Sequence, residues 1–237
     1  MKTLRKTTLL SALLLGTTLP ASAQDTAAAQ ANIDAYSGIP EFTAPGPAFD
    51  AKSCMADKSI LTIPASSAIP FVKTIADAKD ALADELGFKH EQWENQGNPT
   101  QWIQGMEYAG NNGFDVISLL AGADPRFFEP QVKAAQAKGV PVVTSHLTGL
   151  ELEAPAGVDA TTALDYKQAG KLMADWTIAQ TDGNVNALIL VSNEALSTDS
   201  LTDGLVEAYE TNCPDCTYEI VNVPIVDWAT RIQPTVQ

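Results

Sequence analysis

Two cysteines have a spacing that can support chemistry. Cys213 and Cys216 form a C-x-x-C pair directly before a predicted strand. Such a pair can act as a redox-active dithiol, because this spacing lowers the pKa of one thiol. It can also close a loop as a small structural disulfide. A thioredoxin-type motif opens a helix after a strand, whereas this pair follows a helix, so we favour the structural disulfide. Cys54 is left without an obvious partner.

The sequence contains none of the common catalytic or metal-binding motifs. It has no G-x-S-x-G elbow, no H-E-x-x-H, no phosphate-binding loop and no G-x-G-x-x-G after a strand. Only two histidines occur, and neither is closely spaced with a carboxylate and a nucleophile. We therefore expect no enzyme activity, no cofactor and no metal. An exported α/β enzyme would need an unrecognised arrangement of side chains.

Short apolar runs alternate with segments of helical periodicity between residues 58 and 150. We predict strands at 59–64, 114–120 and 140–146, and helices at 69–87, 99–113 and 125–139. Strands that alternate with helices of this length form a parallel sheet with helices on both faces. Such sheets bind ligands at the carboxyl ends of their strands, in the loops that lead into the helices. A binding site is expected there.

The same alternation resumes in the second half of the chain. After a polar connection we predict helices at 166–180 and 198–211, strands at 186–192 and 218–225, and the start of a helix at 227–237. The predicted organisation is an extended arm at 24–57, a first α/β lobe at 58–150, a connection at 151–161 and a partial second lobe at 162–237. Two strands leave a sheet with uncovered faces and edges. We therefore expect the chain to be truncated at its C-terminus.

The N-terminus indicates export from the cytoplasm. A basic start is followed by an apolar run at 9–19, too short to span a bilayer, and by small residues that suit cleavage after Ala23. We predict a signal peptide at 1–23 and a periplasmic, soluble mature protein. The chain carries 29 acidic and 14 basic residues, a formal net charge of −15. Such an acidic protein repels nucleic acid and anionic lipid surfaces, so we exclude both as partners.

Five segments occur in an order and at a spacing that resemble a known family. They are 60–78, 95–109, 133–146, 162–176 and 225–237. The family is that of the periplasmic sugar-binding proteins of ABC importers, the ribose-binding-like group of the type I periplasmic binding fold. The resemblance implies a monomer of two α/β lobes that binds a small hydroxylated solute, a sugar or polyol, between them. It also implies an ABC permease in the inner membrane as partner. A periplasmic sensor of the same fold is the alternative.

Residues of the first lobe match positions at which this family contacts its ligand. The loop after the first strand offers Ser66 and Ser67, and Phe71 matches an aromatic residue there, although it could instead pack in the core. His146 stands where the family often has an aspartate, and an imidazole can still donate to or accept from a hydroxyl. Arg126 could point into the cleft or pair with a nearby acid.

Further candidates lie after the connection. Asp165 could cap a helix or face the cleft, and Asn193 follows a strand. Asp199 stands near a position where the family carries an arginine, and this reversal of charge suggests another substrate. Trp228 matches a stacking aromatic, with core packing as the alternative, and Arg231 could donate to a hydroxyl.

Overall fold

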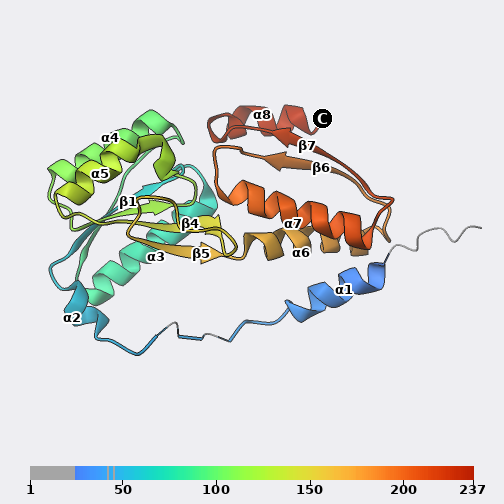
Figure 1. Cartoon of the computed structure of the whole chain (residues 1–237), viewed down its shortest axis with the longest axis horizontal. Coiled ribbons are helices and arrows are strands. Elements are labelled where there is room, and N and C mark those ends of the chain that lie inside the picture. The colour runs from blue at the N-terminus through green and yellow to red at the C-terminus, as the bar shows by residue number, and fades with distance from the viewer. Residues whose placement is uncertain (1–24, 42, 45) are drawn as a thin grey trace, which may run out of the picture.

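The computed structural model describes residues 25–41, 43–44 and 46–237, and within them the chain forms two α/β lobes (Figure 1). The predicted signal peptide lies outside the described residues. Each lobe contains a parallel sheet with flanking helices, so the predicted fold class is confirmed. No helix of the described part is both long enough and apolar enough to cross a membrane.

The first lobe contains a five-stranded parallel sheet. Its strands are β1 (Ser59–Pro64), β2 (Lys89–Gln92), β3 (Val116–Leu120), β4 (Val142–Gly149) and β5 (Ala160–Leu164). The order across the sheet is β2-β1-β3-β4-β5. Helix α3 (Pro70–Leu86) lies on one face, and α4 (Pro99–Asn111), the 3-10 turn η1 (Pro125–Phe128) and α5 (Glu129–Ala137) lie on the other (Figure 1). The order reverses beside β1, which places the ligand-binding crevice at the carboxyl ends of β1 and β3.

The two faces of this sheet differ in polarity because side chains alternate along each strand. Leu61 and Ile63 of β1 are fully buried against the helices α4 and α5, in a cluster that includes Trp102 and Phe128. Thr62 points to the opposite face, beneath α3, and is also fully buried. The main hydrophobic core of the lobe therefore lies on the α4 and α5 side.

Two strands of the first sheet were missing from the sequence prediction. Strand β2 reads Lys-His-Glu-Gln and carries no apolar pattern, because it is an edge strand. The side chain of its His90 is only 1% exposed. Strand β5 pairs with β4, so the first sheet continues through Leu164, beyond the boundary predicted at 150. The chain crosses to the second lobe after β5, and not at 151–161.

The second lobe is built on a two-stranded parallel sheet. It contains α6 (Tyr166–Gln180), β6 (Asn186–Val191), α7 (Ser197–Asn212), β7 (Thr217–Asn222), the turn η2 (Ile225–Asp227) and α8 (Trp228–Thr235). Helices α6 and α7 lie on one side of the sheet and α8 on the other (Figure 1). Leu188 and Ile220 remain 38% and 45% exposed, so the outer face of this sheet is only partly covered.

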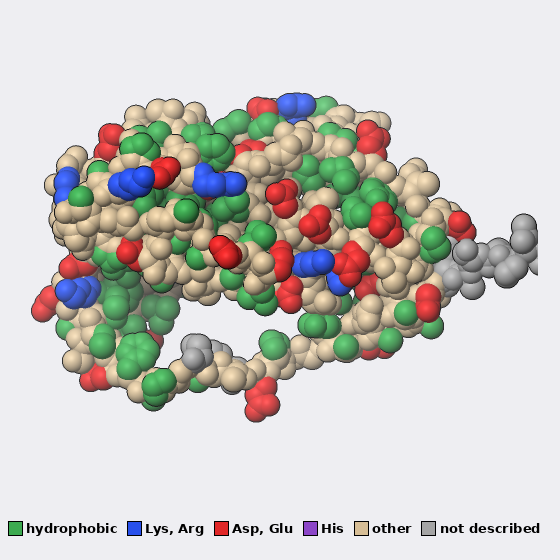
Figure 2. Space-filling view, viewed as in Figure 1, with side chains coloured by type: hydrophobic (Ala, Val, Ile, Leu, Met, Phe, Trp, Pro, Cys, Tyr) green, Lys and Arg blue, Asp and Glu red, His purple; other side chains and the backbone are tan. Residues whose placement is uncertain are grey.

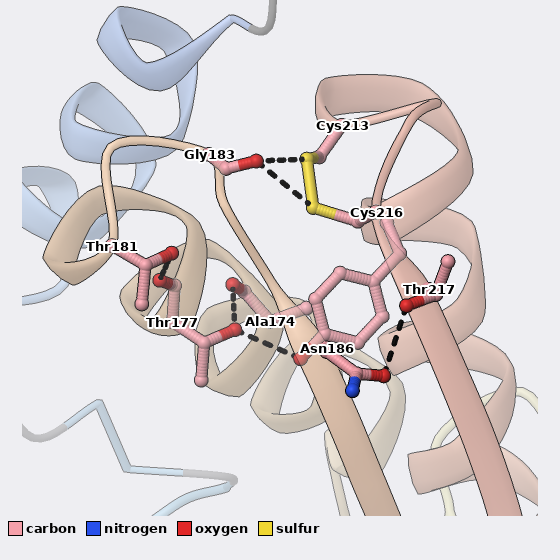
Figure 3. The surroundings of a disulfide bond; sticks show 9 residues. Ala174, Thr177, Thr181, Gly183, Asn186, Cys213, Cys216 and Thr217 are labelled. Atoms are coloured by element: carbon pink, nitrogen blue, oxygen red, sulfur yellow. Dashed lines mark hydrogen bonds between the residues drawn. A yellow bond between two sulfur atoms is a disulfide. The ribbon is translucent and has the colours of Figure 1, made fainter.

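A disulfide joins Cys213 to Cys216 at the end of α7, in agreement with the favoured interpretation of this pair. The carbonyl oxygen of Gly183, in the turn between α6 and β6, lies 3.2 Å from Sγ of Cys213 (Figure 3). The residue directly after Cys216 is Thr217, which begins β7 and donates its hydroxyl to Oδ1 of Asn186 in β6. The disulfide thus closes the short connection between α7 and β7 against the neighbouring turn.

The predicted extended arm at 24–57 contains two helices, and the prediction was wrong there. They are α1 (Thr26–Ala35) and α2 (Ala51–Met55). Helix α1 is Ala-rich and lacks an apolar stripe, which explains why periodicity did not reveal it, yet its Ala29 is fully buried against α6 and α7. The described residues between α1 and α2 run beneath the molecule, and Figure 2 shows open space between them and the body of the protein.

Candidate functional site

A cavity of about 280 Å³ lies between the two lobes. The first lobe contributes the loop after β1, the residue after β3 and the bent end of β4, and the second lobe contributes β6, the start of α7 and the start of α8. The cavity therefore lies at the carboxyl ends of the strands, where the fold class places a ligand. Its size is at the small end of the range for small-molecule sites.

Phe71 and His146 form the aromatic part of the wall on the first lobe. Phe71 is 57% exposed, which excludes the core position considered from the sequence. Its ring meets the imidazole of His146 edge to face, with centroids 5.5 Å apart. His146 has a left-handed backbone with φ of 54°, at the point where the pairing of β4 with β5 shifts register. This local bend interrupts the regular strand beside the cavity.

The imidazole of His146 is held in its neutral form near pH 7. Burial lowers its pKa below the ordinary value of 6.5, and the positive charge of Lys79 lowers it further. Its Nδ1 atom is buried and has no hydrogen-bond partner among the described protein groups. A neutral imidazole offers one donor and one acceptor to a ligand.

Trp228 provides the aromatic side chain of the second lobe. Its Nε1 donates to Oγ of Ser192 at 2.9 Å and to the carbonyl of Val223 at 3.0 Å, which fixes the indole at the cavity wall. Ser192 in turn donates to the same carbonyl at 2.7 Å. The polar edge of the indole is thus occupied by the protein, and its apolar body remains as a surface for stacking.

The two lobes touch each other beside the cavity. Ile225 of η2, only 7% exposed, packs on the glycine-containing loops of the first lobe. A Cβ at Gly97 would lie 2.8 Å from the Cγ2 atom of Ile225, and Gly97 has φ of +80°. A side chain at position 97 would therefore separate the lobes at this point and strain the backbone. The structure shows the lobes in contact beside the cavity, which remains partly open to solvent.

Several predicted ligand residues have other partners in the structure and do not line the cavity. Ser66 accepts from the backbone amide of Ala68 within its own loop, and Ser67 accepts from the backbone amide of Asn95 in the loop after β2. Asp165 caps α6 by accepting from the amide of Gln168 at 2.9 Å. These three residues were predicted to contact the ligand from their positions in the sequence. In the structure their side chains form hydrogen bonds with the backbone instead.

Arg126 pairs with an acid, which was the alternative interpretation of this residue. Its guanidinium lies 2.6 Å from Oδ2 of Asp124, a carboxylate that is completely buried. This contact raises the pKa of Arg126 above its ordinary value. The nearby carboxylate of Asp199 in α7 adds to the same effect, so the pair faces the second lobe.

The remaining candidates lie outside the cavity wall. The backbone amide of Asn193 donates to Oδ1 of Asn222 at 2.9 Å. Asn193 and Asp199 border a separate surface groove. Arg231 is exposed on α8, with its Nη1 atom 3.4 Å from Asp227. Of the ten predicted ligand residues, the structure brings three into one cavity, namely Phe71, His146 and Trp228.

The sequence prediction missed residues at the start of two helices. Thr198 and Thr202 of α7 and Tyr166 of α6 line the cavity. The two threonines are four residues apart, and this spacing puts them on one face of a helix that follows a strand. From the sequence alone, that spacing could have identified the two threonines as a pair on one side of the helix. No group of three or more His, Cys, Asp or Glu side chains within the described ranges could hold a metal ion.

Solved structures of sugar-binding proteins share this fold. A galactofuranose-binding protein has 17% identity and a TM-score of 0.60, and 71% of this chain covers 57% of that chain. The arabinose-binding component of an ABC transporter from Shewanella sp. ANA-3 gives 17% identity and a TM-score of 0.61, covering 71% of this chain and 55% of the other. A glycerol-bound solute-binding protein from Mycobacterium smegmatis has 20% identity and a TM-score of 0.59, and the match covers 71% of this chain and 56% of that chain. This chain thus spans little more than half the length of these structures.

The sequence also matches a family directly. The periplasmic binding protein domain matches residues 60–231, a range that includes the cavity-lining elements of both lobes. No curated protein gives a significant match. Since the matched range covers most of the chain, the protein belongs to the periplasmic binding protein domain family.

Proposed function

We propose that this protein captures a sugar or polyol between its two lobes, outside the cytoplasm, and delivers it as a monomer to an ABC permease. Binding is reversible and involves no chemical step. Membership of the periplasmic binding protein family and the sugar-binding neighbours support this proposal. These neighbours bind galactofuranose, arabinofuranose and glycerol, all small uncharged molecules with several hydroxyl groups.

The observation that carries the proposal is a cavity whose wall is shared between the lobes. Phe71 and His146 come from the first lobe and Trp228 from the second. Aromatic faces suit the apolar C–H side of a sugar ring, and an imidazole suits its hydroxyls. A ligand that contacts both lobes stabilises their closed arrangement, because its affinity for that arrangement exceeds its affinity for the open one.

The proposal is tested by a thermal-shift screen of the purified chain against pentoses, hexoses, polyols and amino acids. We expect one class of sugar or polyol to raise the melting temperature, because a ligand that binds only the folded state stabilises it by mass action. Trp228→Ala should reduce this rise at the same ligand concentration, since it removes the stacking surface of the second lobe. Aromatic stacking contributes about 1 kcal/mol, so affinity should fall roughly fivefold to tenfold.

Trp176→Ala is the matched control. Trp176 lies on α6 with 56% of its surface exposed, and it does not line the cavity. This variant should retain the ligand-induced shift of the unmodified chain. If no sugar or polyol shifts the melting temperature, or if both tryptophan variants lose the shift equally, the proposed site is wrong.

A further inference from the structure

Most polar side chains of the cavity wall already have protein partners. Ser192 donates to the carbonyl of Val223, and Thr198 donates to the carbonyl of Ser192 at 2.8 Å. The hydroxyl of Tyr166 donates to the carbonyl of His146 at 3.0 Å. A ligand would have to compete with these internal bonds in order to use the same groups.

Two buried polar atoms of the wall have no such partner among the described protein groups. They are Nδ1 of His146 and Oγ1 of Thr202. His146 comes from β4 of the first lobe and Thr202 from α7 of the second. Buried polar groups in folded proteins are nearly always hydrogen-bonded, because an unpaired one loses its hydration without compensation. Both residues line the cavity, but these two atoms have almost no exposed surface, so a hydroxylated ligand could pair with them only when the side chains turn toward it.

The rest of the wall offers little to a hydroxyl group. No Asp, Glu, Lys or Arg among the described residues lines the cavity. The apolar contribution comes from both lobes and consists of Ile69, Phe71, Val72, Ala121, Ile189, Leu190, Val191, Ala195, Leu201, Ile225 and the body of Trp228. Arg126, which the sequence suggested could point into the cleft, is paired with Asp124 and does not line the cavity. A ligand hydroxyl that faced this surface would be dehydrated without gaining a partner.

We infer that the cavity selects an uncharged, partly deoxygenated sugar, and that the side chain of Thr202 in the second lobe turns toward the cavity to bond one hydroxyl of this sugar. This inference rests on the proposed function and narrows its substrate class. A methyl group in place of a hydroxyl matches the apolar wall. An apolar pocket discriminates against an added hydroxyl only moderately, so we expect a preference of about tenfold to a hundredfold.

Calorimetric titration with matched pairs of sugars tests the substrate class. Each pair has the same ring stereochemistry and differs only in the hydroxyl at carbon 6: L-fucose with L-galactose, D-fucose with D-galactose, and L-rhamnose with L-mannose. We expect the 6-deoxy member of at least one pair to bind at least tenfold more tightly than its parent. Equal or tighter binding of the parent in every pair that binds would overturn the inference and leave the proposed function intact. Binding of no sugar of any class would overturn both.

Thr202→Val tests the role of the second lobe. The valine has nearly the same shape but lacks the hydroxyl, so affinity for the preferred sugar should fall about tenfold. The melting temperature without ligand should stay the same or rise, by about 2–4 °C at most, because an unpaired buried hydroxyl has been removed. A purely structural role would lower the melting temperature and leave the affinity unchanged, which would overturn the assignment of Thr202.

Thr74→Val is the control for this substitution. Thr74 is an exposed residue of α3 whose hydroxyl donates to the carbonyl of Pro70, and it lies outside the cavity wall. This variant should bind the preferred sugar as tightly as the unmodified chain. If Thr74→Val weakens binding as much as Thr202→Val does, the effect is not specific to the cavity and the inference fails.

Discussion

A buried amine lies beneath α3 in the first lobe. Nζ of Lys79 donates to Oγ of Ser118 at 2.9 Å and lies 3.4 Å from Oγ1 of Thr62. Thr62 is bonded to Nε2 of His90, whose Nδ1 contacts Asp80. No carboxylate within the described chain forms a salt bridge with Lys79, and burial lowers its pKa from 10.5 to about 8. The folded protein therefore holds this proton more weakly than the unfolded chain does.

This difference predicts a specific dependence of stability on pH. Between about pH 8 and pH 10.5 the unfolded chain keeps the proton of Lys79 while the folded protein releases it, so stability rises with pH in this window. Lys79→Met removes the effect. The free energy of unfolding of the unmodified chain, relative to that of the variant, should rise by at most about 3 kcal/mol from pH 7 to pH 10.5. Urea unfolding at a series of pH values measures this difference.

Lys73→Met provides the control on the same helix. Lys73 is exposed and bonded to Asp77, and this hydrogen bond raises its pKa above 10.5. Its loss should produce no relative gain for the unmodified chain between pH 8 and pH 10.5. Parallel pH profiles for the unmodified chain and Lys79→Met would show that the amine is not destabilised by burial.

Individual site residues were predictable where their place depends on the strand they follow. Phe71, His146 and Trp228 each follow or end a predicted strand, and all three line the cavity. The hydroxyl of Ser67 accepts a hydrogen bond from the backbone amide of Asn95 in the loop after β2, a contact that sequence position does not reveal. Thr202 lies in a helix interior, and its orientation toward the cavity depends on how α7 packs against the first lobe. Tertiary packing, which the periodicity of the sequence does not reveal, therefore determines that Thr202 lines the cavity.

Helices α6 and α7 are in unusually close contact through two glycines. A Cβ at Gly170 of α6 would lie 2.1 Å from the carbonyl oxygen of Leu201, and one at Gly204 of α7 would lie 2.0 Å from that of Lys167. Both obstructing atoms belong to the backbone, so a substitution must move a whole helix. The position of α7, and with it the cavity wall at Thr198 and Thr202, depends on this contact.

Gly204→Ala should destabilise the protein by about 2 kcal/mol or more, because it overpacks this contact. Gly110→Ala in α4 is the matched control, since its Cβ would meet nothing closer than 3.7 Å. There the change should stabilise by up to about 1 kcal/mol, as alanine is preferred to glycine inside a helix. Denaturant unfolding of both variants measures the difference. Equal effects of the two substitutions would contradict the proposed role of the contact.

The elements that sequence analysis missed share one physical feature. Strand β2 and helix α1 have no apolar period, because β2 is a polar edge strand and α1 buries only an alanine. Strand β5 (Ala160–Leu164) is short and follows a polar connection, so its pairing with β4 could not be seen in its residues. The apolar strands β1, β3 and β4 were predicted, with ends that differ by a few residues. An element that buries large apolar side chains has a periodic pattern in the sequence, whereas an element held mainly by backbone hydrogen bonds or by small side chains does not.

At the scale of the whole molecule, the N-terminal segment connects the two lobes. Helix α1 packs on α6, where Nδ2 of Asn32 donates to the buried carboxylate of Asp175 at 2.9 Å. The described residues that follow run beneath the molecule toward α2, which lies beside the first lobe (Figure 1). Asp175 also accepts from Asn212 of α7 at 2.7 Å, so α1 adds to an interaction that already links α6 and α7. Helix α1, which lies within the segment predicted to be an arm, therefore packs on the core of the second lobe.

Ala29→Asp tests this role, because it places a carboxylate at a fully buried position between α1 and α6. Burying an unpaired charge is costly, so α1 should detach, and a ten-residue helix is unstable by itself. Hydrogen exchange should then accelerate in α1, α6 and α7 and stay unchanged in β1 and β3. Ala27→Asp adds the same charge at an exposed position near the helix N-terminus and should leave exchange unchanged. Equal acceleration in both lobes would mean that they unfold as one unit.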